Sequence, residues 1–136
     1  MSYHLTIEEK PSYLHAKVTG THNAQNARRF LVEVHEACVQ RNFSRVLLEM
    51  NFSGRSMDIF SIFDVISERS PDALKFERIA YVDASSERDP QQAKFAETVA
   101  NNRGVNVRLF RNLDDAERWI RGSTSENSDK GSENEI

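Results

Sequence analysis

Residues 44–66, SRVLLEMNFSGRSMDIFSIFDVI, decide the fold, because they pass from a strand through a short turn into an apolar helix. The segment 44–50 is predicted to be a strand. Gly54 gives the following turn its backbone freedom, and Ser56 is the predicted N-cap of a helix over 57–69. Strands separated by helices run parallel, with the helix as the crossover, so this segment predicts an α/β domain.

The N-terminal residues are predicted to form an antiparallel hairpin. Apolar and polar residues alternate in 3–8 and again in 13–19, which is the period of a strand with one buried face. Pairing Leu5 with Ala16 places all the apolar side chains on the same side of the hairpin. The residues expected to face outward are His4, Thr6, His15 and Lys17.

The rest of the chain repeats the alternation of strand and helix. Strands are predicted for 79–82 and 105–110, and in the second of these the alternation places Arg108 on the side away from the core. The element order is ββαβαβαβα, a five-stranded mixed sheet with an N-terminal antiparallel hairpin followed by parallel strands. Because the second and fifth strands alternate, helices are expected to cover mainly one face. The remaining helices are predicted at about 24–41, after Asp89-Pro90, and from Asn112 to Gly122.

A chain of 136 residues has the size of one domain. We place an α/β domain at residues 1–121 and a disordered acidic tail at 122–136, because the tail has four acidic residues, one basic residue and almost no apolar ones. The other 17 basic and 17 acidic residues leave the domain neutral. A neutral domain lacks the long-range field that attracts nucleic acid or an anionic membrane, so neither partner is predicted.

The sequence also predicts a cytoplasmic protein that is not integral to a membrane. Its one cysteine, Cys38, has no internal disulfide partner, and the N-terminal MSYHLTIEEK lacks the apolar stretch of a signal peptide. No apolar run approaches the roughly 20 residues that a membrane-spanning helix needs.

No catalytic, metal-binding or cofactor-binding residues are predicted. The four histidines have no cysteine or carboxylate at a metal-ligand spacing, and we interpret them as solvated surface side chains. Cys38 follows His35 by three residues, which places the two near one another on a helix and would allow a thiolate pair. Cys38 also completes the apolar stripe of that helix, so we interpret it as a small buried hydrophobe.

The turn NFSGRS at residues 51–56 is the best-placed candidate site. It follows a parallel strand, and open α/β sheets bind ligands at the carboxyl ends of their strands. The turn lacks the Gly-Lys-Ser/Thr of a P-loop and the Gly-x-Ser-x-Gly of a nucleophile elbow. Its alternative interpretation is an ordinary turn followed by a helix cap.

The predicted helix at 57–69 has more apolar surface than one face of a sheet covers. At 100° per residue, its isoleucines and phenylalanines fill an arc of about 160°, while Val65 and Met57 lie outside it. Such an excess indicates either a deeply buried helix or a surface that meets a partner helix, a second subunit or a lipid-like ligand. Together with the turn, this arc forms a candidate surface that consists of Phe52, Ser53, Gly54, Ser56, Ile59, Phe60, Ile62, Phe63 and Ile66.

The sequence resembles the SpoIIAA-like family in its element order and in the strand SRVLLEM. The resemblance extends to two further stretches, KFERIAYVDASSERDP (75–90) and VNVRLFRNLDDAERWI (105–120). That family is grouped with STAS domains and is compared with CRAL-TRIO lipid-binding domains. The resemblance covers nearly all of residues 3–121. It implies a non-enzymatic module that binds a protein partner or an apolar small molecule.

The resemblance also points to a phosphorylation site at the start of the helix. Anti-sigma-factor antagonists of the STAS type carry an Asp-Ser-Ser-Gly-like phosphoacceptor segment there. This chain has Asp58-Ile59-Phe60-Ser61 at the corresponding position, so Phe60 replaces the usual acceptor serine. Ser56 and Ser61 flank that position and are the candidate phosphoacceptors, since the helix dipole favours phosphate at a helix start.

The sequence therefore predicts a regulatory module that binds a protein partner through the candidate surface. A homodimer is one outcome, because two-fold dimers are the commonest assembly. The alternative is a small carrier or sensor of a lipid-like apolar ligand, with the same helix as the wall of a cavity of about 300 Å³ or more. An enzyme would need convergent titratable groups, which the sequence does not place together.

Overall fold

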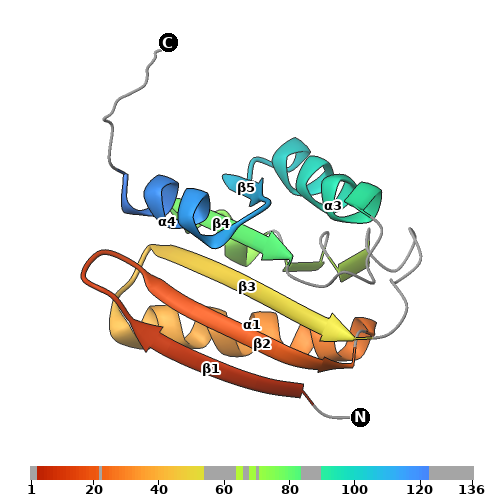
Figure 1. Ribbon diagram of the computed structural model, residues 1–136, viewed down its shortest axis with the longest axis horizontal. Coiled ribbons are helices and arrows are strands. Elements are labelled where there is room, and N and C mark those ends of the chain that lie inside the picture. Colours follow the sequence, from red (N-terminus) through yellow and green to blue (C-terminus); the bar gives the residue numbers. More distant parts are fainter. Residues whose placement is uncertain are drawn as a thin grey trace.

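The computed structural model describes residues 3–21, 23–53, 64–65, 68–69, 71–83 and 90–122 (Figure 1). Strands and helices alternate along most of this chain, as the sequence predicts. The strands are β1 (Tyr3–Glu9), β2 (Leu14–Thr21), β3 (Arg45–Ser53), β4 (Arg78–Asp83) and β5 (Val107–Phe110), and the longer helices of the described residues are α1 (Ala24–Arg41), α3 (Pro90–Asn102) and α4 (Leu113–Arg121).

The five strands form one sheet in the order β1-β2-β3-β4-β5. β1 is antiparallel to β2, and each later strand is parallel to its neighbour. The predicted five-stranded mixed sheet with an N-terminal hairpin is therefore confirmed. Because β2 to β5 are parallel, they all end at the same edge of the sheet, where β3 leads into the predicted turn.

The register of the hairpin differs from the predicted one by two residues. Leu5 pairs with Val18, not with Ala16, because β1 continues to Glu9, which pairs with Leu14. The backbone N–H of Lys10 donates to the carbonyl of Tyr13 at 2.9 Å and closes a shorter loop than the prediction assumed. A shift of two residues keeps every side chain on its own face, so the apolar residues still share one side.

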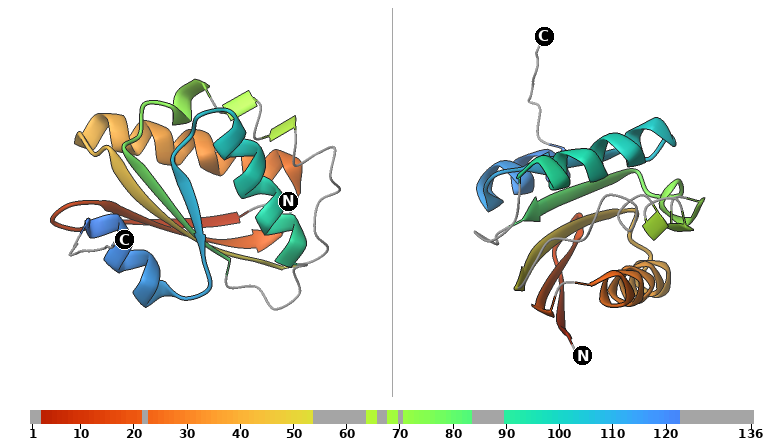
Figure 2. Two further views of the ribbon diagram at one scale, coloured as in Figure 1. Left: turned by 90° about the horizontal axis from the view of Figure 1, so that it is seen from above. Right: turned by 90° about the vertical axis from the view of Figure 1, so that its right-hand side faces the viewer.

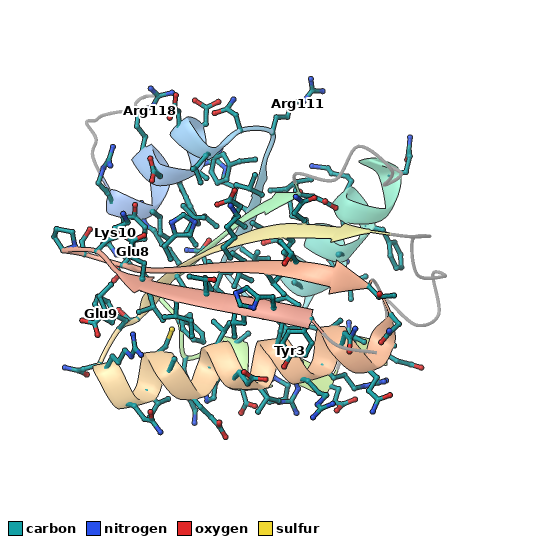
Figure 3. The ribbon with its side chains drawn as sticks, turned by 60° about the horizontal axis from the view of Figure 1, so that its bottom comes forward. Tyr3, Glu8, Glu9, Lys10, Arg111 and Arg118 are labelled. Atoms are coloured by element: carbon teal, nitrogen blue, oxygen red, sulfur yellow. The ribbon has the colours of Figure 1, made fainter. Side chains whose placement is uncertain are left out.

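The main core lies between the sheet and α1. The helix starts at Asn23, whose side chain accepts a hydrogen bond from the N–H of Asn26, and it ends at Asn42 in a left-handed conformation with φ 63°. Tyr3 of β1 points toward the helix and donates to Glu33 (Figure 3). The helix contributes buried apolar side chains to this core, namely Ala27, Phe30, Val34, Ala37 and Cys38.

A second, smaller core lies on the opposite face of the sheet, under α4. Leu47 of β3 and Ala80 of β4 are fully buried there against Ala116 and Ile120 of the helix. Figure 2 shows α1 and α4 on opposite sides of the sheet. Ala100 of α3 belongs to the main core, so the predicted placement of helices mainly on one face holds, and α4 is the exception.

Candidate functional site

The carboxyl edge of the sheet carries the start of the candidate surface. Phe52 and Ser53 are the last two residues of β3, and their backbones pair with Gly20 and Thr21 of β2. The predicted start of the turn at residue 51 is therefore wrong, because 51–53 pair with β2 and extend the strand. The strand carries the chain to the edge where open α/β sheets bind ligands. The other residues of the candidate surface, and the candidate phosphoacceptors, lie outside the described residues: Gly54, Ser56, Ile59, Phe60, Ser61, Ile62, Phe63 and Ile66.

Val65 connects the predicted helix to the main core. Its side chain is only 2% exposed, and it packs in the core cluster beneath α1. The neighbouring Asp64 is exposed. The helical wheel places Val65 outside the arc of the candidate surface. The residue of this helix that contacts the core is therefore not one of the arc.

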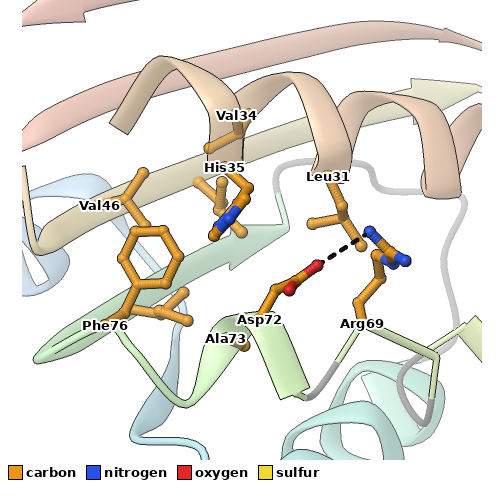
Figure 4. A pocket seen from close by; sticks show the side chains of 10 residues that line it. Leu31, Val34, His35, Val46, Arg69, Asp72, Ala73 and Phe76 are labelled. Carbon is orange, nitrogen blue, oxygen red and sulfur yellow. Dashed lines mark hydrogen bonds and ion pairs between the residues drawn. The ribbon is translucent and has the colours of Figure 1, made fainter. Parts of the chain in front are cut away.

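An apolar hollow lies between α1 and the segment that carries Arg69, Asp72 and Phe76 (Figure 4). Its volume is about 60 Å³, whereas pockets for organic ligands start near ~300 Å³. The hollow therefore has room for a few water molecules but not for a lipid-like ligand. Its walls come from α1, two strands and the 69–76 segment, including Leu31, Val34, Val46, Leu48, Ala73 and Phe76.

His35 lines this hollow, and its predicted solvation is wrong. Its ring meets that of Phe76 edge-on, with 5.8 Å between ring centroids. Its Nδ1 is buried and has no hydrogen-bond partner among the described residues. The Nε of Arg69 is in the same situation, although another nitrogen of that guanidinium donates to Asp72 at 3.3 Å. The helix period alone could not reveal this environment, because Phe76, which the His35 ring meets, lies on a separate segment after β3.

His15 is also less solvated than predicted. Its Nε2 lies 2.9 Å from Oε1 of Glu49 on β3, and the two side chains are only 12% and 18% exposed. His4 is exposed, as expected, whereas His22 lies outside the described residues. The contact between His15 and Glu49 links two neighbouring strands on the face away from α1. Within the described ranges, no group of three or more His, Cys, Asp or Glu residues could hold a metal ion.

Cys38 is a buried core residue, as predicted. Its side chain is 1% exposed, and burial raises the pKa of the thiol to about 11. The thiol is therefore protonated at neutral pH, and a thiolate paired with His35 does not form under these conditions.

A cluster of cationic and aromatic side chains, not anticipated from the sequence, lies at the amino end of the parallel strands. Arg78 starts β4, and Arg108 is on β5; both guanidinium groups stand over the ring of Trp119 on α4, at 5.2 Å and 5.8 Å from its centroid. Arg45 on β3 forms two hydrogen bonds with Glu77, at 2.8 Å and 3.1 Å. This pairing raises the pKa of Arg45 and lowers that of Glu77.

The comparisons with known proteins agree with this architecture. The family model described as SpoIIAA-like matches residues 13–121. No curated relative matches the sequence. In the described part of the chain, no helix has the length and apolar character needed to cross a membrane.

Two solved structures are similar to this chain. An uncharacterised protein of Shewanella loihica with a SpoIIAA-like fold has 16% identity and a TM-score of 0.54, and the match covers 87% of this chain and 93% of that one. An anti-sigma factor antagonist of Mycobacterium paratuberculosis has 14% identity and a TM-score of 0.60, with 88% and 95% coverage. At these identities the likeness establishes the fold.

Proposed function

The chain belongs to the SpoIIAA-like family, and from that premise we propose that it is a non-enzymatic regulatory module that binds another protein through the candidate surface. The observation that carries the proposal is the contact of Val65. On the predicted helix, Val65 lies about 60° from Ile62, on the side away from the rest of the arc. On the predicted helix, a core contact centred on Val65 would leave most of the arc available to a partner.

The structural neighbour from Mycobacterium paratuberculosis supports a protein as the partner. Its description, an anti-sigma factor antagonist, names a protein that acts on another protein. In this chain Phe60 stands where antagonists of that kind carry the acceptor serine, so recognition would rest on apolar contact. Phosphorylation of Ser56 or Ser61 would place two negative charges beside that contact and weaken it.

The hollow beside α1 bears on the alternative function, a carrier of an apolar ligand. A volume of about 60 Å³ is several times smaller than the ~300 Å³ that such a ligand needs. This hollow is therefore not a lipid cavity, but none of its lining residues belongs to the candidate surface, so the cavity predicted beside that surface stays a prediction. Native mass spectrometry of gently purified protein tests the carrier directly, because a carrier would retain lipid.

Sedimentation velocity at tens of micromolar tests the proposal in its homodimer form. Wild-type protein is expected to contain a dimer that Phe60→Asp dissociates, because a carboxylate buried without a partner is costly at an apolar contact. Val39→Asp is the matched control, since Val39 is 65% exposed on α1 and is not part of the candidate surface. The proposal would be refuted if wild-type protein is a monomer and if Phe60→Asp changes neither the stability of the protein nor the amount of partner protein that co-purifies with it.

A further inference from the structure

An open polar hollow lies at the amino end of β4 and β5, away from the candidate surface. Its volume is about 500 Å³, which is within the range of ligand-binding pockets. Arg78, Arg108 and Trp119 line it, together with Lys94 and Glu97 of α3. Three of these five side chains are cationic and one is anionic, so the hollow has an excess of positive charge.

The single carboxylate in the hollow is already engaged. Glu97 is 9% exposed, and its two oxygens accept from the backbone N–H of Leu109 at 2.7 Å and from Lys94 at 2.9 Å. Among the described residues no carboxylate lies within ion-pair distance of Arg78 or Arg108. Neither guanidinium group therefore has a direct carboxylate partner there, and Glu77, whose charge acts on Arg78, is itself hydrogen-bonded to Arg45.

Trp119 holds the two guanidinium groups near each other. Arg78 also donates to the backbone carbonyl of Trp119, which fixes it against the end of α4. Burial, helped by the charges of Arg45 and Arg108 and opposed by Glu77, lowers the pKa of Arg78. Clustered like charges are unfavourable unless an anion joins them. A guanidinium stacked on a ring keeps its N–H donors at its edge, where they can reach such an anion.

We propose that this hollow binds a compact oxyanion, either inorganic phosphate or the phosphate or carboxylate group of a small molecule. Two neighbouring guanidinium groups offer the planar, paired donors that such groups accept. Strands and a helix hold these side chains in place, since Arg78 comes from β4, Arg108 from β5 and Trp119 from α4. Arg45, which pairs with Arg78, lies eight residues before the end of β3, so the hollow is about 26 Å along the strand from the turn.

Trp119 is the only tryptophan of the chain, so its fluorescence reports directly on the hollow. Titration with inorganic phosphate, with chloride added to keep the ionic strength constant, is expected to give a saturable change. Arg108→Gln should weaken phosphate binding about tenfold, the loss that one charge-assisted pair brings. Arg111→Gln removes the same charge from an exposed residue that does not line the hollow (Figure 3), and it should leave the affinity unchanged.

The acidic residues after Gly122 are a second source of the same chemistry. If they occupy the hollow, the double variant Glu126→Gln, Asp129→Asn binds phosphate more tightly than wild type; an unchanged affinity assigns the hollow to a free anion. Either result supports the proposal. A wild type that responds no more to phosphate than to chloride, or equal effects of the Arg108 and Arg111 variants, would overturn it.

Discussion

The second core predicts that α4 is an integral layer of the domain and that Ile120 is its main anchor. The Ile120 side chain is 0% exposed beneath the helix. Ile120→Ala removes three carbon atoms, which at about 0.8 kcal/mol each gives a transfer loss of about 2.4 kcal/mol. The cavity left behind adds to this, because Leu47 and Ala80 belong to strands that cannot collapse into it. The expected loss of unfolding free energy is therefore about 3–4 kcal/mol.

Equilibrium urea unfolding measures this loss, with far-ultraviolet circular dichroism for the whole domain and Trp119 fluorescence for α4. The two probes should give coincident transitions, because the helix and the sheet share one core. Ile120→Val should cost only about 1 kcal/mol, since it removes a single carbon atom. Val39→Ala, at a site that is 65% exposed, should change stability by less than about 0.5 kcal/mol.

Two results would refute this reasoning. A loss below about 1 kcal/mol in Ile120→Ala would mean that the second core contributes little. A fluorescence transition at lower urea than the circular dichroism transition would mean that α4 detaches while the sheet remains folded.

Three further predictions follow from single contacts. Asn112→Ala should lower the unfolding free energy by about 1 kcal/mol, because the Asn112 side chain accepts from the N–H of Asp115 at 2.9 Å; Asn112→Ser, which keeps an acceptor, should lose much less in the same urea titration. Gly122→Ala should cost about 1–2 kcal/mol, since Gly122 has φ 74° and a Cβ would lie 2.7 Å from a nitrogen of Arg45; an unchanged melting temperature would contradict this. Burial raises the Cys38 pKa from 9.0 to about 11, so the protonated thiol favours the folded state: the stability of wild type relative to Cys38→Ala should be constant below pH 9 and fall as the pH rises toward 11. Rapid reaction of the native thiol with a disulfide reagent at pH 8 would argue against that burial.

Local signals predict the helix ends well. Asn112 and Gly122 bound α4 as expected, because each acts through its own backbone: Asn112 by accepting from an N–H three residues later, and Gly122 by adopting a left-handed conformation. The hairpin register fails because it depends on where the loop closes. Alternation fixes which face each residue occupies, but a shift of two residues satisfies it equally.

The second core shows how far a strand pattern can be interpreted. In β3 the consecutive residues Val46, Leu47 and Leu48 are all buried, a run that is typical of a strand covered on both faces. The alternation in β2 and β5 pointed instead to one covered face. Both signals are correct, because α4 covers the central strands and leaves the outer face of β2 to polar side chains such as Lys17.

The histidines and the arginine cluster show what a sequence cannot place. His15 is partly buried by its contact with Glu49, which lies 34 positions later in the sequence. The ring of His35 meets that of Phe76, which lies on a different segment. Arg108 was correctly expected to face away from the main core. What alternation could not reveal is that α4 brings Trp119 to the same face, since the side on which a helix packs is decided by the whole sheet.

The proposed protein-binding surface and the proposed oxyanion site can be tested independently, because they lie at opposite ends of the parallel strands. The predicted turn follows the carboxyl end of β3, whereas Arg78 is the first residue of β4 and Arg108 the second residue of β5. Screening by salt reduces the interaction between exposed charges beyond roughly 10 Å, and the two regions are about 26 Å apart along β3. Phe60→Asp should therefore leave the phosphate titration of Trp119 unchanged, and Arg108→Gln should leave sedimentation unchanged. Coupling between the two measurements would require a conformational change that passes through the sheet itself.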